Sequence, residues 1–287
     1  MIYDAVIIGS GVAGLSAGLY LARAKKSVMI IEDGVIGGTT ATLECIENYP
    51  GIISTSGINL VQTMIQQVTN LGVNIDFMNI KHIDFDKKIL TCDENIVEFK
   101  TLIIASGTSY NKLNLDEESK FRFRGLSYCA VCDGSLYKNK KIVIASNGYS
   151  AKNDIDYLKN ITNKIVVIDS ESKIKGEGLT VYNNSHINKL NGDGQIESVD
   201  ITLLNGENIR IECDAVFVAL GKSTNLNLYD GIQIKDGFIL SDENMHTNIE
   251  GVFCAGDIRY KTLRQIVTAC SDGAIAGTEA IKYLQNK

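Results

Sequence analysis

Two absences narrow the class of this 287-residue protein before any motif is considered. No run of apolar residues reaches membrane-spanning length, and no basic segment or cleavage site precedes the first strand pattern, so we expect no membrane partner and a cytoplasmic location. Basic residues are not in excess either, because 28 lysines and arginines stand against 34 acidic residues, for a net charge of −6. This balance argues against a nucleic-acid-binding surface. The length is comfortable for two domains.

Histidine is also scarce, which bears on metal binding. Cys129 and Cys132 are the one closely spaced cysteine pair, in the stretch YCAVCDG over residues 128–134. A zinc site would need a second close pair of cysteine or histidine ligands. The other candidates are scattered singletons: Cys45, Cys92, Cys213, Cys254, Cys270, His82, His186 and His246. A zinc half-site and a buried unreactive pair stay as minor alternatives, and no metal is expected.

The paired cysteines point to redox chemistry. In a reducing compartment seven cysteines are not a framework of structural disulfides, so a Cys-x-x-Cys pair is more often catalytic or metal-binding. Where such a pair opens a helix, unpaired backbone N–H groups near the first sulfur favour its thiolate, which makes Cys129 the expected attacking group. The sulfur of Cys132 is expected to face inward, and Asp133 to exchange a proton when the disulfide opens. These three are the predicted catalytic residues.

The N-terminal segment predicts a dinucleotide-binding βαβ unit. Residues 2–8 form an apolar strand pattern, a helix pattern runs through about residue 24, and a second apolar run over 27–31 ends in an acid. In such a unit one glycine makes the tight turn, a second lets the backbone approach a pyrophosphate, a third lets helix and strand pack, and the acid binds a ribose hydroxyl. The predicted cofactor contacts here are Gly9, Ser10, Gly11, Ala13, Gly14 and Glu32.

This motif alone does not separate FAD from NAD, and further loops favour FAD. Glycine-bearing loops at 37–39 and 47–51 could hold an isoalloxazine, and a strand over 101–104 ends on small residues. The stretch 251–257 repeats the strand-then-glycine design, with its last residue placed to hold a ribityl hydroxyl. A final helix from about 263 to 284 would direct its N-terminus at the flavin. These segments add the predicted FAD contacts Gly38, Thr39, Asn48, Ala105, Gly107, Gly256 and Asp257.

The predicted fold class is α/β, with two Rossmann-like dinucleotide-binding domains. The flavin segments lie on one fold only if the chain leaves that fold and returns to it. Residues 1–113 and 225–287 are therefore expected to form a split FAD-binding domain, with a helix at about 57–71. Residues 114–224 are expected to form an inserted, degenerate NAD(P)H-like domain that carries the cysteine pair.

Several motifs in order carry a family resemblance: ENYPG at 47–51, CAVCDG at 129–134, GVFCAGD at 251–257, and Arg264 with Gln265. With these motifs the chain resembles the low-molecular-weight thioredoxin reductases over almost its full length. The resemblance implies an FAD-containing homodimer in which the first cysteine attacks the disulfide of thioredoxin, the second contacts the flavin, and the following aspartate donates a proton. It also adds Arg264 and Gln265 to the expected FAD contacts.

The inserted domain departs from that family at its nucleotide site. Where the family has a Gly-x-Gly-x-x-Ala turn, this turn begins with Ser146, whose Cβ is expected to crowd it. Where the family carries His-Arg-Arg for the 2′-phosphate of NADPH, this chain has Asp169 and Glu171, which would repel a phosphate. The helix that should follow is nearly absent over 172–178. NADPH is a poor candidate, and NADH stays open because an acid here binds a free 2′-hydroxyl.

The pattern looks most like the ferredoxin-dependent flavin thioredoxin reductases of anaerobic bacteria, which keep both domains and the cysteine pair but lack a working NADPH site. That resemblance implies reduced ferredoxin as electron donor. Because ferredoxins are usually acidic, a locally basic docking face is expected; its candidates are Arg122, Arg124, Lys138, Lys140, Lys141, Arg259, Lys261 and Arg264.

Two alternative functions stay open. One is an NADH- or NADPH-dependent reductase of thioredoxin or a peroxiredoxin. The other is an FAD-binding redox sensor without turnover, which the intact Cys129, Cys132 and Asp133 set disfavours.

Overall fold

The structure is a computed structural model, and it describes residues 2–93, 95–176 and 178–287. Met1 and Glu94, in the predicted FAD-binding domain, and Glu177, in the predicted 172–178 connection, lie outside the described residues.

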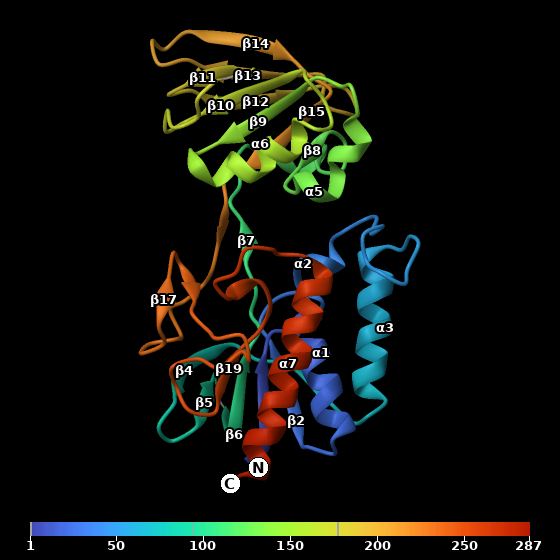
Figure 1. Cartoon of the computed structure of the whole chain (residues 1–287), viewed down its shortest axis with the longest axis vertical. Coiled ribbons are helices and arrows are strands. Elements are labelled where there is room, and N and C mark those ends of the chain that lie inside the picture. Colours follow the sequence, from blue (N-terminus) through green and yellow to red (C-terminus); the bar gives the residue numbers. More distant parts are fainter. Residues whose placement is uncertain (1, 94, 177) are drawn as a thin grey trace. The chain divides into compact units, whose positions relative to one another are not determined.

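The chain forms two compact units, which are described separately (Figure 1). One unit contains the residues up to Ser109 together with Thr224–Lys287, and the other is Tyr110–Ser223. The chain passes between them through the strands β7 (Ser109–Tyr110) and β16 (Lys222–Ser223), which pair with each other. None of the helices in the described part of the chain is both long enough and apolar enough to cross a membrane.

The first unit is built on a sheet of strand order β3-β2-β1-β6-β5-β4, and β19 pairs with the last residues of β6. The antiparallel strands β4 and β5 extend the sheet beyond β6, and the other strands run parallel. The strand bounds are β1 (Ile2–Ile8), β2 (Val28–Glu32), β3 (Asn74–Phe77), β4 (Ile80–Asp84), β5 (Ile89–Cys92), β6 (Asn95–Ile104) and β19 (Val252–Cys254).

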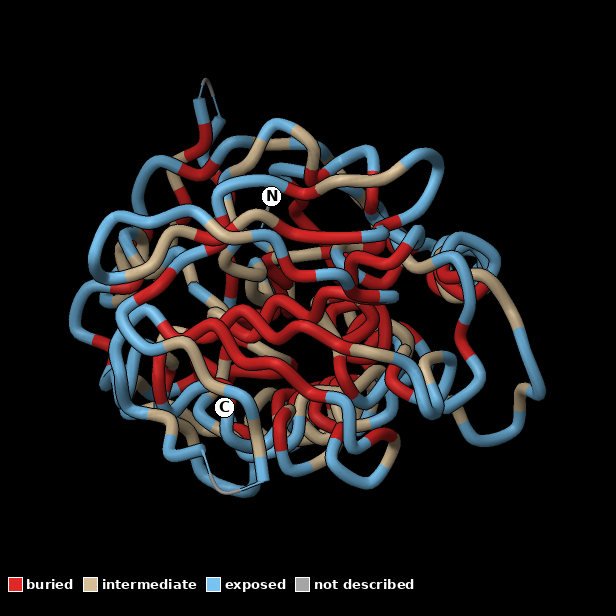
Figure 2. Tube along the Cα trace, turned by 90° about the horizontal axis from the view of Figure 1, so that it is seen from above, coloured by how far each residue is buried: buried red, intermediate tan, exposed pale blue. Residues whose placement is uncertain are grey.

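Both faces of this sheet are covered, as the near-continuous apolar runs predict. Along β1, Ala5 and Ile7 face one hydrophobic cluster, and Val6 and Ile8 face another, because successive side chains in a strand point to opposite faces. In Figure 2 the buried stretches follow the strands, and the exposed ones follow the connecting loops. The packing on both faces therefore fixes the carboxyl ends of the parallel strands.

Helices α1 (Val12–Arg23) and α7 (Ile266–Gln285) lie alongside each other in Figure 1. Glycine permits this approach, because a Cβ on Gly273 would lie 2.1 Å from the carbonyl oxygen of Ala13. The first unit also contains α2 (Gly38–Ala41), α3 (Gly57–Thr69), the 3-10 turn η3 (Gly256–Ile258) and the hairpin of β17 (Ile234–Lys235) and β18 (Phe238–Ile239).

The second unit is a smaller parallel sheet of order β11-β10-β9-β15-β8, with an antiparallel sheet of order β12-β13-β14. The parallel strands are β8 (Leu126–Ser127), β9 (Ile142–Ser146), β10 (Ile165–Asp169), β11 (Thr180–Asn183) and β15 (Ala215–Ala219). The antiparallel strands are β12 (His186–Asn191), β13 (Ser198–Thr202) and β14 (Asn208–Glu212). The predicted α/β class with Rossmann-like sheets is confirmed.

Helical segments in the second unit are short. They are α4 (Glu118–Phe121), α5 (Ala130–Asp133), η1 (Gly134–Tyr137), η2 (Tyr149–Ala151) and α6 (Lys152–Leu158). Between β10 and β11 the described residues contain no helix, which confirms the predicted loss. The described part of this connection therefore consists of turns and irregular backbone.

Candidate functional site

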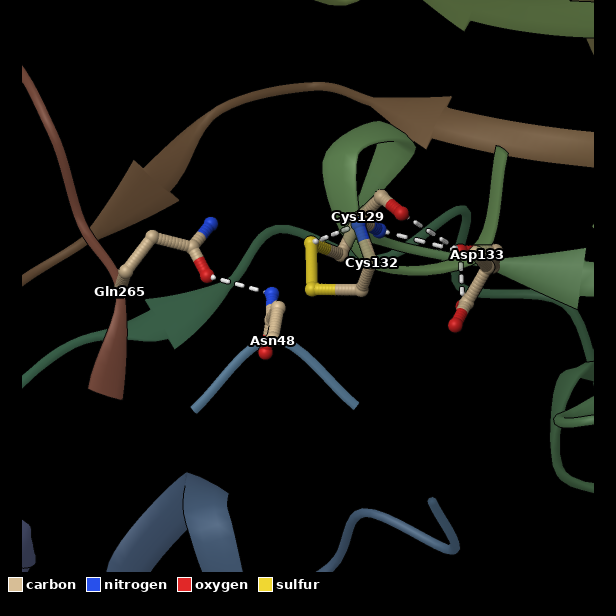
Figure 3. The surroundings of a disulfide bond; sticks show 6 residues. Asn48, Cys129, Cys132, Asp133 and Gln265 are labelled. Carbon is tan, nitrogen blue, oxygen red and sulfur yellow. Dashed lines mark hydrogen bonds between the residues drawn. A yellow bond between two sulfur atoms is a disulfide. The ribbon is translucent and has the colours of Figure 1, made fainter. Parts of the chain in front are cut away.

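The cysteine pair lies where β8 leads into α5. Cys129 and Cys132 form a disulfide, and Cys129 caps α5 by accepting a hydrogen bond at its Sγ from the backbone N–H of Cys132 at 3.2 Å (Figure 3). Cys129 is half-buried and Cys132 is exposed. The expectation that the second sulfur faces inward is therefore wrong, because α5 is a single turn that buries only Ala130.

Ser127 connects the disulfide to the neighbouring acid. Its buried hydroxyl donates to Oδ2 of Asp133 at 2.6 Å and accepts from the backbone N–H of Cys129 at 3.1 Å. The backbone N–H of Asp133 also donates to the carbonyl of Cys129 at 3.1 Å. The three predicted catalytic residues are therefore brought together, and sequence reasoning missed the serine, two positions before the pair, that holds them.

A second buried acid braces the segment before the pair. Glu118 accepts the phenol hydrogen of Tyr128 and the backbone N–H groups of Leu113, Asn114 and Leu115. Burial and the bond to Glu118 raise the pKa of Tyr128 above its ordinary value. The backbone next to Cys129 is thus anchored by a carboxylate with its hydrogen bonds satisfied.

The other cysteines do not form a second reactive group. Burial raises the pKa of Cys213 to about 12 and also raises the pKa values of Cys92, Cys254 and Cys270, which disfavours their thiolates. Cys45 is exposed. Within the described ranges, no group of three or more His, Cys, Asp or Glu side chains is arranged to hold a metal ion.

In the first unit, the turn after β1 forms an open cradle. Gly9 has φ +101°, and a Cβ there would lie 2.4 Å from the carbonyl oxygen of Ala105. A Cβ on Gly14 would lie 1.9 Å from the carbonyl oxygen of Gly9. Gly11, by contrast, has no atom within 4 Å of its Cβ position. It precedes α1, whose N-terminus has no side-chain cap and no acidic residue in its first turn. The first N–H groups of α1 can therefore bind a phosphate.

Glu32 ends β2 and is buried beside this turn. Its carboxylate accepts hydrogen bonds from the N–H of Ser10 at 2.8 Å, from the Ser10 hydroxyl at 2.6 Å and from the N–H of Gly34 at 2.8 Å. A carboxylate fixed in this way can accept further hydrogen bonds from sugar hydroxyls.

The remaining predicted contacts gather at the same end of the sheet. A Cβ on Gly256 would lie 2.8 Å from the Cβ of Ala13, so the loop after β19 packs on the start of α1. Thr39 donates from its hydroxyl to the carbonyl of Thr108 at 3.5 Å. Open Cβ positions also occur at Gly107, which has nothing within 4 Å, and at Gly38, whose nearest atom is the Cα of Gly11 at 3.7 Å.

The start of α7 adds a polar pair. The side chain of Asn48 donates to Oε1 of Gln265 at 3.1 Å, which joins two predicted FAD contacts from distant segments (Figure 3). Helix α7 begins at Ile266, later than predicted, because Gln265 and Thr268 form a reciprocal capping box.

Arg264, another predicted FAD contact, is bonded to the backbone of the loop that follows β19. Its guanidinium donates to the carbonyls of Asp257, Arg259 and Lys261 and lies over the ring of Phe238. It therefore fixes the loop that carries Asp257, and burial lowers its pKa.

Asp272 is a further residue that sequence reasoning missed. This buried carboxylate accepts from the N–H of Gly256 at 3.1 Å, from Arg259 at 3.0 Å and from Lys261 at 2.9 Å. Arg259 and Lys261 expose only 11% of their side chains. Together with Arg264 they hold the loop in place, so their assignment to a basic docking face is wrong.

The equivalent turn of the second unit is built differently. Ser146 ends β9 outside the left-handed region, and its hydroxyl accepts the N–H of Gly148 at 3.0 Å and donates to Asp169 at 3.2 Å. The expectation that its Cβ crowds the turn is wrong, because the bend has moved to Gly148 at φ +95°. Asp169 is fully buried and also accepts the backbone N–H groups of Lys173 and Ile174.

Gly148, which matches Gly11 in sequence position, is covered. A Cβ there would lie 2.9 Å from Cδ of Lys173 and 3.2 Å from Oε2 of Glu171. These two side chains form an ion pair of 2.6 Å. The space that a pyrophosphate would need beside this turn is therefore occupied by side chains of the connection after β10.

Comparison with known proteins places these features in one family. Residues 3–273 match the family described as pyridine nucleotide-disulphide oxidoreductase. A thioredoxin reductase of Listeria innocua is 35% identical over 99% of this chain and 94% of its own length.

Solved structures of thioredoxin reductases are also similar to this chain. The crystal structure of thioredoxin reductase from Streptococcus pyogenes is 32% identical, with a TM-score of 0.93 over 100% of this chain and 99% of that one. A ferredoxin-flavin thioredoxin reductase from Clostridium acetobutylicum is 27% identical, with a TM-score of 0.57 over 100% of this chain and 99% of that one.

Proposed function

Because the chain belongs to the pyridine nucleotide-disulphide oxidoreductase family, and within it to the low-molecular-weight thioredoxin reductases, we propose that it reduces the disulfide of thioredoxin through FAD and the Cys129–Cys132 pair. The unit that contains residues 2–109 and 224–287 is the FAD-binding domain, and residues 110–223 carry the redox-active disulfide. By family likeness the enzyme is a cytoplasmic homodimer.

FAD is the cofactor of this family, and the first unit fits it. The open position at Gly11 and the uncapped start of α1 suit the pyrophosphate, and Glu32 suits a ribose hydroxyl. Asp257 and the Asn48–Gln265 pair are assigned to the ribityl chain and the ring. When bound, FAD supplies two electrons for the disulfide.

Cys129, Cys132 and Asp133 have different roles in the reaction. Reduction adds two electrons and two protons and gives the Cys129 and Cys132 thiols. The Cys129 thiolate attacks the disulfide of thioredoxin and forms a mixed disulfide. The Cys132 thiolate then breaks this mixed disulfide, which releases reduced thioredoxin and re-forms the Cys129–Cys132 disulfide. Asp133, held beside the pair by Ser127, exchanges the proton that leaves or joins a sulfur.

We further propose that the electron donor is reduced ferredoxin. The observation that carries this step is the contrast between Gly11, which is open, and Gly148, which Lys173 and Glu171 cover. In addition, Asp169 is fully buried and bonds to Ser146 and to the backbone of its own loop, whereas Glu32 keeps 7% of its surface exposed; this burial supports a donor other than a nucleotide. The likeness to the Clostridium acetobutylicum ferredoxin-flavin enzyme is consistent with this donor.

A pyridine nucleotide is the second candidate donor, because the description of the matched family names it. It would require Lys173 and Glu171 to leave Gly148 and Asp169 to exchange its internal partners for a nucleotide.

The assigned role of Cys129 is tested by Cys129→Ser. With chemically reduced ferredoxin as donor, the variant should lose thioredoxin reduction completely and keep its full FAD content, because the serine hydroxyl is a far weaker nucleophile than a thiolate. Turnover is read from the thiols that appear on thioredoxin. Cys45→Ser, which replaces the exposed cysteine outside the pair, is the matched control and should keep full activity. Full activity of the Cys129 variant would remove this residue from the mechanism.

A further inference from the structure

The hydroxyl of Ser127 is placed to serve two forms of one acid. It is 5% exposed and has one hydrogen to donate and lone pairs with which to accept. That hydrogen has two possible acceptors, Oδ2 of Asp133 at 2.6 Å and the carbonyl of Cys129 at 3.4 Å. The backbone N–H of Cys129 meanwhile donates to the same hydroxyl at 3.1 Å.

These contacts cover both protonation states of Asp133. When the acid is ionised, the serine donates to the carboxylate, which is the short bond observed. When the acid is protonated, it can donate to the serine oxygen, and the serine hydrogen can turn to the carbonyl of Cys129. Neither state then leaves a buried polar group without a partner.

We propose that Ser127 is a positioning residue that holds Asp133 against the Cys129–Cys132 pair through a full proton exchange. In this role it acts through Asp133. The inference rests on the proposed function only for the identity of the physiological oxidant and reductant, because the contacts themselves lie within residues 127–133.

A dithiol reagent tests the step without ferredoxin or thioredoxin. One thiolate of dithiothreitol attacks one sulfur of the pair, the S–S bond breaks, and the other sulfur leaves with the electron pair and takes a proton, which Asp133 supplies. The second reagent thiol breaks the mixed disulfide and departs in a cyclic disulfide, so the protein gains two electrons and two protons. The holoenzyme is quenched with an alkylating agent, and mass spectrometry of the peptide that contains both cysteines gives the rate.

Ser127→Thr and Ser127→Val form the matched pair, since they have nearly the same shape and differ in the hydroxyl. We expect the valine variant to react about tenfold more slowly than wild type, and the threonine variant to stay within about twofold. Ser185→Ala, which removes another buried serine of the same unit, should react at the wild-type rate. Equal rates for the threonine and valine variants would overturn the proposal.

A double-mutant cycle separates positioning from a structural effect. If Ser127 acts through Asp133, Ser127→Val should slow the reaction by no more than about twofold in an Asp133→Asn background. A full, multiplicative loss in that background would overturn the proposal. In turnover with thioredoxin, Ser127→Val should lower kcat and leave KM unchanged; a wild-type enzyme that fails on thioredoxin would refute the substrate while leaving the dithiothreitol comparison valid.

Discussion

Gly11 and Gly148 take the same place in the turns that follow β1 and β9, and the surroundings of their Cβ positions differ. The Cβ position of Gly11 is empty to 4 Å, whereas that of Gly148 meets Lys173 and Glu171. A glycine in this place serves ligand approach only where the space beyond it is free. The contrast between the two turns therefore depends on side chains more than 20 residues away from Gly148 in the sequence.

This comparison predicts the effect of Gly11→Ala. The added methyl group projects into the space assigned to the pyrophosphate, so FAD affinity should fall at least about tenfold, while the fold is kept because φ at Gly11 is −65°. Released flavin is measured by its fluorescence after dilution.

Gly148→Ala probes the equivalent position, where a φ of +95° strains an alanine and should lower the stability of the fold. It should leave FAD affinity unchanged, because no flavin contact is assigned to that turn. Wild-type FAD affinity in the Gly11 variant would contradict the assignment of the cradle.

At this scale the sequence predicted residues whose roles follow from a motif and missed those whose roles follow from tertiary contacts. The glycines of the first turn and the Cys129, Cys132 and Asp133 set belong to recognisable spacings. Glu118 and Asp272 do not, because their partners are backbone N–H groups and side chains that only the folded chain brings together.

Among the elements, the short segment from α4 to α5 is anchored by the buried carboxylate of Glu118. Tyr128→Phe removes the hydrogen bond to Glu118 and should lower the free energy of unfolding by about 1 kcal/mol at pH 8. The folded state raises the pKa of this phenol above its unfolded value of about 10. The stabilisation is therefore fully present below about pH 10 and is lost as the pH rises through the folded pKa.

Urea unfolding of wild type and Tyr128→Phe across pH 8 to 11 measures this difference. The gap between the two midpoints should narrow above about pH 10. A gap that widens with pH would show that the phenol is not the stabilising form.

The central strands and long helices follow closely from hydrophobic periodicity, because β2, β9, β10 and β15 are mostly apolar runs that are buried along their whole length. Ends and turns follow less well. The Cβ of Ser146 was predicted to crowd its turn, but the residue with positive φ is Gly148, and the serine hydroxyl bonds to Gly148 and Asp169. The absent helix after β10 was predictable from its polar, glycine-bearing sequence.

For the whole molecule, the two compact units predict separable functions. A fragment of residues 110–223 should fold alone, show one cooperative thermal transition and contain the Cys129–Cys132 disulfide without flavin. Residues 2–109 joined by a short glycine linker to 224–287 should retain FAD. Flavin bound to the 110–223 fragment, or absent from its complement, would contradict the assignment of the two domains.

The central claim concerns the source of electrons, and anaerobic bleaching of the flavin absorbance tests it most directly. The holoenzyme is mixed in turn with excess NADPH, NADH and chemically reduced ferredoxin, with oxidised thioredoxin present to complete the cycle. The covered turn at Gly148 and the buried carboxylate of Asp169 predict bleaching and thioredoxin reduction with ferredoxin only. Rapid bleaching by NADH or NADPH would contradict the account and return the protein to the nicotinamide-dependent reductases.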